Sequence, residues 1–132
     1  MARRAAVNVL LDTCALLALA DGDLPPAAAS ALRHAPEAYV STVSAWEVAI
    51  KVAGGRLRLK APPVQWFLGL VERYDLREAT LNAAIATTAA ALPPLHRDPF
   101  DRAIAALAQL RGLTVLTSDE QIGKYPGVTT AW

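Results

Sequence analysis

The feature that most constrains the fold is a series of short apolar runs, each followed by a segment with helical periodicity. The clearest runs are residues 7–11 and 113–117, and buried strands are typical of such β-branched and aliphatic stretches. Weaker strand candidates are residues 37–40, 76–80 and 128–132. Strands alternating with helices predict an α/β fold with a short, mostly parallel central sheet and helices on both faces.

Caps and breakers place the helices between these strands. Ser41 or Thr42 is expected to cap one helix and Thr80 another, and proline pairs open two more. Residues 56–60 alternate charge with leucine and stay ambiguous. We expect helices over residues 14–20, 25–35, 43–53, 62–74, 81–92 and 99–110, and a short helical turn over residues 120–125.

Composition sets the class of protein. The 132 residues, 54% of them hydrophobic and 19% charged, fit a single globular domain over residues 1–132. The one cysteine, Cys14, excludes an intramolecular disulfide, and its apolar surroundings favour a small core residue in a reducing compartment. We expect neither a signal peptide nor a membrane span, and hence a cytoplasmic protein. The net charge of +1 excludes a strongly basic nucleic-acid coat protein.

Two aspartates follow the two clearest strands. Asp12 comes directly after the first strand, and Asp119 comes shortly after residues 113–117. In open parallel sheets, ligands bind outside the carboxyl ends of the strands, so we expect both carboxylates at one site. Each aspartate has an alternative role as the cap of the helical segment that follows it.

Two further acids lie on predicted helices. Glu47 has nearly all-apolar neighbours, so it faces either a polar site or a solvent stripe on which Lys51 pairs with it. Asp98 precedes Pro99 and is placed as a helix N-cap, with Asp101 in the first turn. Asp101 can reach back as part of a capping box or point into the site.

Four carboxylates in a small volume repel one another unless a cation lies between them. Hard oxygen ligands suit Mg²⁺ or Mn²⁺. With two histidines and one cysteine, the chain offers no zinc-type spacing. His96 is close to the acidic motif in the sequence, so it either approaches the site or structures the loop there, and we expect the loop role.

Taken in order, these motifs resemble those of the PIN-domain ribonucleases, and in particular the VapC-type toxins of bacterial toxin–antitoxin pairs. The motifs are Leu10-Leu11-Asp12-Thr13, Ser44-Ala45-Trp46-Glu47, His96-Arg97-Asp98-Pro99-Phe100-Asp101-Arg102 and Leu116-Thr117-Ser118-Asp119. The resemblance covers essentially the whole chain, and the ordered set is more specific than any single motif.

The resemblance implies a three-layer α/β/α fold and Mg²⁺- or Mn²⁺-dependent cleavage of RNA. It implies an acidic quartet of Asp12, Glu47, Asp101 and Asp119, in which Asp12 and Asp101 hold metal while Glu47 and Asp119 bind it directly or through water. It also implies a homodimer and a cognate antitoxin that blocks the site.

The expected chemistry is hydrolysis of a phosphodiester by metal-bound water. Supporting hydrogen bonds are expected from Thr13, Asp98, Thr117 and Ser118. Trp46 and Trp66 are expected in the core or at a dimer interface. Candidate contacts for substrate phosphates are Arg97, Arg102, Lys51, Arg56 and Arg58.

Rival interpretations come from other classes of protein. A phosphoacceptor receiver domain needs adjacent acids after its first strand, whereas Thr13 follows Asp12 here. A phosphatase with an aspartate nucleophile usually has a second aspartate two residues later, where this chain has Cys14. A non-catalytic interaction domain stays open, because an intact quartet does not prove turnover.

Overall fold

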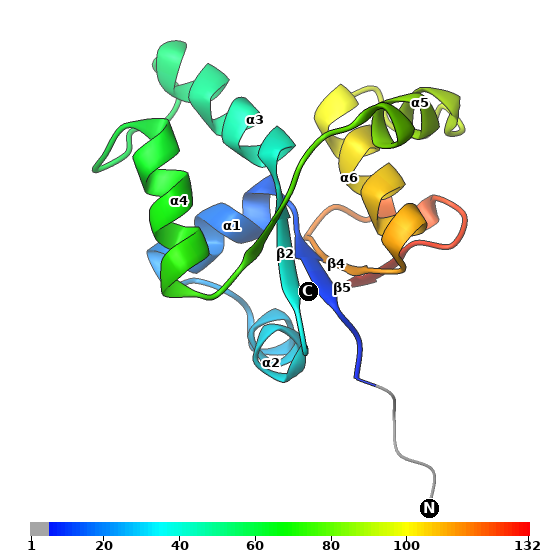
Figure 1. Ribbon diagram of the computed structural model, residues 1–132, viewed down its shortest axis with the longest axis horizontal. Coiled ribbons are helices and arrows are strands. Elements are labelled where there is room, and N and C mark those ends of the chain that lie inside the picture. Colours follow the sequence, from blue (N-terminus) through cyan, green and yellow to red (C-terminus); the bar gives the residue numbers. More distant parts are fainter. Residues whose placement is uncertain (1–5) are drawn as a thin grey trace, which may run out of the picture.

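The computed structural model describes residues 6–132, and one parallel five-stranded sheet lies at its centre (Figure 1). The strand order is β3-β2-β1-β4-β5, and every neighbouring pair is parallel. The strands are β1 (Val9–Leu11), β2 (Ala38–Ser41), β3 (Arg77–Ala79), β4 (Thr114–Leu116) and β5 (Thr129–Ala131). The prediction of an α/β fold with a short parallel sheet is confirmed.

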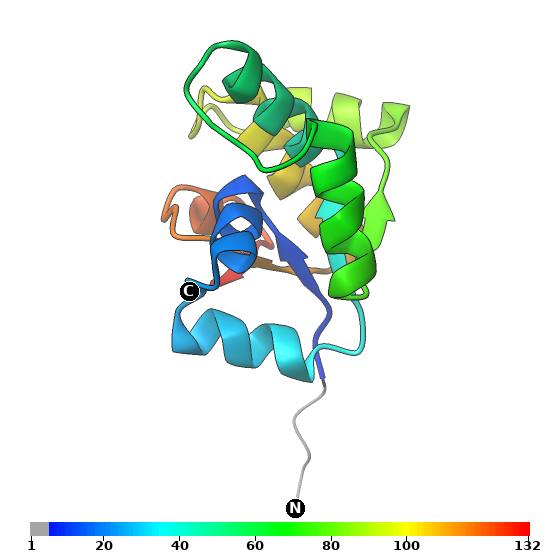
Figure 2. The same ribbon diagram turned by 90° about the vertical axis from the view of Figure 1, so that its left-hand side faces the viewer.

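Helices cover both faces of this sheet. The helices are α1 (Thr13–Asp21), α2 (Pro26–His34), α3 (Thr42–Ala53), α4 (Pro63–Arg73), α5 (Ala83–Ala91) and α6 (Pro99–Arg111), with a 3₁₀ turn, η1 (Ile122–Lys124). Residues of α1, α2 and α4 pack on one face, and residues of α5, α6 and η1 pack on the other. In Figure 2, α1 and α4 lie in front of the sheet, and α2 (light blue) lies below it.

Alternation along β1 explains how three consecutive buried residues serve two cores. Val9 and Leu11 belong to the core with α1 and α4, whereas Leu10 belongs to the core with α5 and α6. Successive strand side chains point to opposite faces, so a strand covered on both sides must be apolar at every position. The apolar run that identified β1 in the sequence is unbroken over the strand itself, as its central place in the sheet requires.

The strand order also creates a switch point between β1 and β4. From β1 the chain proceeds through β2 to β3 on one side, and it then returns to place β4 and β5 on the other side. Ligands of doubly wound sheets bind at such a point, beyond the carboxyl ends of the strands. A receiver domain has the order 2-1-3-4-5 instead, so the topology excludes that rival.

Two local predictions are wrong. Asn82, not Thr80, caps α5, and its Oδ1 accepts a hydrogen bond from the Ile85 N–H at 2.9 Å. Cys14 is exposed, because α1 buries Ala15, Leu16 and Leu19 against the sheet and turns position 14 outward. Partial burial and the charge of Asp12 raise the pKa of the Cys14 thiol, so it stays protonated and is a poor nucleophile.

Across residues 6–132, no helix is both long enough and apolar enough to cross a membrane.

Candidate active site

Asp12 leaves the end of β1 and begins α1. It is 3% exposed, and its Oδ1 accepts a hydrogen bond from the Ala15 N–H at 2.8 Å. The capping role and the position at the switch point are therefore compatible, because a carboxylate has a second oxygen for another partner. Burial raises the pKa of Asp12; hydrogen bonds from Thr117 and Ala15 oppose this, while the charges of Asp119 and Glu47 raise it further.

Asp119 lies in the loop after β4, on the other side of the switch point. Its Oδ1 accepts a hydrogen bond from the Gln121 N–H at 2.9 Å, and its own N–H donates to Thr117 Oγ1 at 3.0 Å. Thr117 is buried and Ser118 is exposed. Thr117 thus contacts Asp119, whereas Ser118 shows no such contact among the hydrogen bonds of the described residues.

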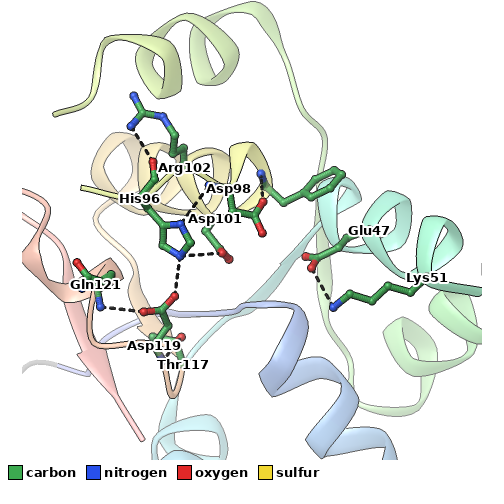
Figure 3. A network of polar contacts seen from close by, with 10 residues as sticks. Glu47, Lys51, His96, Asp98, Asp101, Arg102, Thr117, Asp119 and Gln121 are labelled. Carbon is green, nitrogen blue, oxygen red and sulfur yellow. Dashed lines mark hydrogen bonds and ion pairs between the residues drawn. The ribbon is translucent and has the colours of Figure 1, made fainter. Parts of the chain in front are cut away.

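The start of α6 separates two neighbouring aspartates into two roles. Asp98 is the N-cap, and its Oδ1 accepts a hydrogen bond from the Phe100 N–H at 2.8 Å. Asp101, in the first turn of the helix, lies beside His96, with its Oδ2 3.1 Å from His96 Nε2 (Figure 3). The structure therefore favours Asp101 over Asp98 as the residue that faces the site.

His96 is a site residue whose role the sequence did not reveal. Its Nε2 lies 2.8 Å from Asp119 Oδ2 as well as 3.1 Å from Asp101 Oδ2. Its Nδ1 accepts a hydrogen bond from the Asp98 N–H at 3.1 Å, so the expected loop contact is also present. The signal in the sequence was a histidine just before the acidic motif, but nothing in it placed the ring next to Asp119.

Glu47 projects from α3 toward the same space, opposite Asp101 in Figure 3. Its side chain is only 13% exposed, which is inconsistent with a solvent stripe, although its Oε2 does pair with Lys51 Nζ at 3.1 Å. Trp46 and Phe100 pack edge to face with ring centroids 5.0 Å apart, and this contact joins α3 to α6. Trp46 remains 57% exposed, so of its two predicted places the core is wrong and the dimer interface stays a prediction.

The other predicted residues lie around this centre. Thr13 donates a hydrogen bond to Ser44 Oγ at 3.0 Å and so connects α1 to α3. Arg102 donates to backbone carbonyls at the end of α5 and in the loop before α6, including Leu92 at 2.8 Å and His96 at 3.3 Å. Its guanidinium therefore holds this loop, whereas Arg97 is exposed.

The acids of the site carry more negative charge than their surroundings balance. Burial raises the pKa of Asp101 to about 7; the charge of Asp98 adds to this, His96 opposes it, and Glu47 and Asp12 raise it further. The Oε1 atom of Glu47 is buried and has no hydrogen-bond partner among the described residues. An unpartnered buried carboxylate oxygen costs free energy unless a cation or a proton compensates it.

These observations fit a divalent cation. The donor set consists of carboxylate oxygens, which Mg²⁺ and Mn²⁺ prefer. Ligand atoms of His96, Asp101 and Asp119 lie within 4.8 Å of one another, and the charges of Asp12 and Glu47 act on the pKa of Asp101. A cation among these groups would balance the charge that raises the pKa values of Asp12 and Asp101.

The structure is that of an α/β protein with an acidic site at the switch point of a parallel sheet. Comparisons with known proteins identify the family. The chain matches the PIN domain family over residues 9–128. It is 33% identical over 112 residues to Ribonuclease VapC22 of Mycobacterium tuberculosis, a match that covers 83% of this chain and 85% of that protein. The chain belongs to the PIN-domain family.

Solved structures share the fold at lower sequence identity. VapBC2 from Rickettsia felis, bound to a promoter DNA fragment, gives a TM-score of 0.69 with 14% identity and covers 93% of this chain and 96% of that one. DNA-bound VapBC from Salmonella typhimurium gives 0.63 and 17%, covering 94% and 96%. A toxin–antitoxin complex from Klebsiella pneumoniae gives 0.60 and 21%, covering 92% and 96%.

Proposed function

We propose that this protein is a metal-dependent endoribonuclease and the toxin of a toxin–antitoxin pair. The observation that carries the proposal is the buried acidic cluster at the switch point, with one Glu47 oxygen unpartnered. A ribonuclease relative at 33% identity supports cleavage of RNA. A non-catalytic interaction domain would not need to gather these carboxylates, and gathering them costs free energy.

Each acidic residue has a role in this proposal. Asp12 and Asp101 are the principal ligands of Mg²⁺ or Mn²⁺, and Glu47 and Asp119 complete the ligand set directly or through water. When bound, the cation supplies an activated water and offsets charge that develops on the phosphate. The chain itself fixes Asp12 through the α1 N-terminus and Asp119 through the Gln121 N–H.

Cationic side chains near the cluster hold the RNA backbone in this proposal. Lys51 lies beside Glu47, and the exposed Arg97 precedes α6. Contacts of this kind position a nucleic acid without reading its sequence. Arg102 is not assigned a contact with RNA phosphate, because its guanidinium donates to backbone carbonyls.

The partner proposals rest on the relatives. Solved structures with this fold include VapBC proteins and a toxin–antitoxin complex. We therefore propose that a cognate antitoxin binds the chain and inhibits cleavage, and that the chain forms a homodimer. Copurification with the product of a small neighbouring reading frame, followed by light scattering, tests both proposals.

Mapping of cleavage sites in total RNA tests the nuclease proposal. Purified chain with Mg²⁺ or Mn²⁺ is expected to produce discrete new RNA ends, and Asp12→Asn is expected to abolish them. Asp21→Asn is a matched control, because Asp21 is an exposed residue at the end of α1. Equal cleavage by the wild type and Asp12→Asn would refute the assignment, and failure of the wild type to bind Mn²⁺ would favour a non-catalytic domain.

A further inference from the structure

His96 joins two acids that come from different elements of the fold. Asp101 belongs to α6 and Asp119 to the loop after β4, and 23 residues separate His96 from Asp119 along the chain. His96 Nε2 lies 2.8 Å from Asp119 Oδ2 and 3.1 Å from Asp101 Oδ2. One ring nitrogen therefore lies between two carboxylates that would otherwise repel each other.

The other ring nitrogen determines where the proton of His96 lies. Nδ1 is 3.1 Å from the backbone nitrogen of Asp98, and a backbone N–H group can only donate. Nδ1 is therefore an acceptor, and the neutral ring carries its proton on Nε2. The Nε2–H group then donates toward Asp101 and Asp119 together.

We propose that His96 is a positioning residue that orients Asp101 and Asp119 for a divalent cation. The Asp98 N–H group fixes the ring and its tautomer, and the Nε2–H group fixes one oxygen of each carboxylate. The second oxygen of Asp101 stays available for the cation. This inference rests on the proposed function, since it assigns a role within the same site.

The residues around His96 are anchored as a positioning role requires. Arg102 donates a hydrogen bond to the His96 carbonyl at 3.3 Å and to the Pro93 carbonyl at 3.0 Å, which holds the loop. Asp119 is held from a second direction by the Gln121 N–H at 2.9 Å. The His96 ring thus connects two segments that hydrogen bonds hold in place.

Direct ligation of the cation by His96 is the alternative, and the hydrogen bonds argue against it. A protonated Nε2 has no lone pair to offer a metal. Ligation would require the proton to move to Nδ1, which would break the bond from the Asp98 N–H group. Residues of this kind, which orient ligands without binding the metal, typically have an effect of about 10- to 100-fold on metal affinity or activity.

Calorimetry with Mn²⁺ tests the affinity. His96→Ala is expected to bind Mn²⁺ about 10- to 100-fold more weakly than the wild type. His96→Gln is expected to recover much of the affinity, because its amide N–H can donate to a carboxylate. His34→Ala is the matched control and is expected to leave the affinity unchanged, since His34 is exposed on α2 and contacts Ser30. Wild-type Mn²⁺ affinity in His96→Ala would overturn the proposal.

Nitrogen-15 NMR of labelled histidine separates positioning from ligation and needs only the wild type. On addition of Mg²⁺, the Nε2 of His96 is expected to keep its attached proton. Loss of that proton with a shift toward a coordinated nitrogen would overturn the proposal in favour of a ligand. This measurement decides the question even where His96→Ala does not fold.

Steady-state cleavage distinguishes this inference from the proposed function. At saturating Mn²⁺, His96→Ala is expected to lower kcat more than it changes KM for RNA. If the wild type cleaves RNA while His96→Ala keeps its kcat and its Mn²⁺ affinity, the positioning role alone fails. If the wild type does not cleave RNA, the proposed function fails. The Mn²⁺ affinities and the NMR signature still test the positioning role of His96.

Discussion

The acidic site has two sides that are stabilised in different ways. On the His96 side, which consists of His96, Asp101 and Asp119, one ring N–H group lies between two carboxylates at 2.8 and 3.1 Å. On the Glu47 side, which consists of Asp12, Glu47 and Lys51, Asp12 caps a helix and Glu47 pairs with Lys51. One Glu47 oxygen is left buried and unpartnered there.

Under the proposed function, this difference indicates which side a bound cation would stabilise more. Hydrogen bonds within the protein already hold the His96 side in place, so a change of His96 itself should mainly alter the geometry of its two carboxylates. The Glu47 side carries negative charge that the described residues balance only through Lys51, so a change there should mainly alter electrostatics.

The largest effect is expected from Asp101→Asn on the His96 side. Removal of one carboxylate that the proposal makes a principal ligand is expected to lower RNA cleavage about 1000-fold, equivalent to several kcal/mol of transition-state stabilisation. Asp98→Asn is the matched control, because asparagine caps helices as well as aspartate does. The measurement is kcat/KM on one RNA, and equal losses in the two variants would contradict the separation of ligand from cap.

The next effect is a dependence of metal affinity on pH. Because the pKa of Asp101 is raised to about 7, a proton competes with the cation for this carboxylate at lower pH. Mn²⁺ affinity is expected to fall about tenfold between pH 8 and pH 6 from Asp101 alone, with about half a proton released per ion at pH 7 and more at lower pH. Calorimetry in buffers of different ionisation enthalpy measures both quantities, and a flat profile with no proton release would contradict the assignment.

The residues that could be placed from the sequence are those whose neighbours in the chain determine their position. Asp12 follows an apolar run that ends at the sheet edge, and Asp98 precedes a proline at a helix start. Local rules for strand ends and N-caps apply to both residues. The different roles of Asp98 and Asp101 could also be argued from the sequence, because both residues are placed relative to the same helix start.

The residues that could not be placed depend on packing between distant segments. His96 contacts Asp119 only because the loop before α6 crosses beside the end of β4. Cys14 is exposed because α1 rotates a different face onto the sheet. Glu47 stayed ambiguous because α3 has apolar residues on most sides, and only its packing against α6 shows that position 47 faces the acids.

A smaller effect concerns stability of the metal-free protein. The pKa of Asp101 is raised on folding from 3.8 to about 7, so the folded state binds this proton more tightly than the unfolded chain does. The resulting stability is present below the unfolded pKa and is lost as pH rises toward 7. Relative to Asp101→Asn, the wild type is expected to lose on the order of 1 kcal/mol between pH 5 and pH 8, a value reduced for partial exposure to solvent.

Urea unfolding in the presence of a chelator measures this difference. The difference in unfolding free energy between the wild type and Asp101→Asn excludes the contribution of titrating groups that both proteins contain. Addition of Mn²⁺ at pH 8 is expected to restore the stability of the wild type more than that of Asp101→Asn. A wild type that becomes relatively more stable as pH rises would contradict the sign of the shift.

The smallest effect is expected from Lys51→Ala on the Glu47 side. An ion pair four residues apart on a helix typically contributes about 0.3–0.5 kcal/mol, so the metal-free protein is expected to lose roughly that much stability. A bound cation would take over the balance of charge at Glu47, and the loss should therefore shrink when Mn²⁺ is present. Arg33→Ala, which removes an exposed cation from α2, is the control and should show no such dependence.

The same variant also tests the proposed contact between Lys51 and RNA. If Lys51 binds a phosphate, the KM for RNA rises in Lys51→Ala while the affinity for Mn²⁺ stays the same or increases slightly. If Lys51 serves only to balance Glu47, the KM is unchanged. A stability loss that is equally large with and without Mn²⁺ would mean that the cation does not act on Glu47, and the division of the site into two sides would then fail.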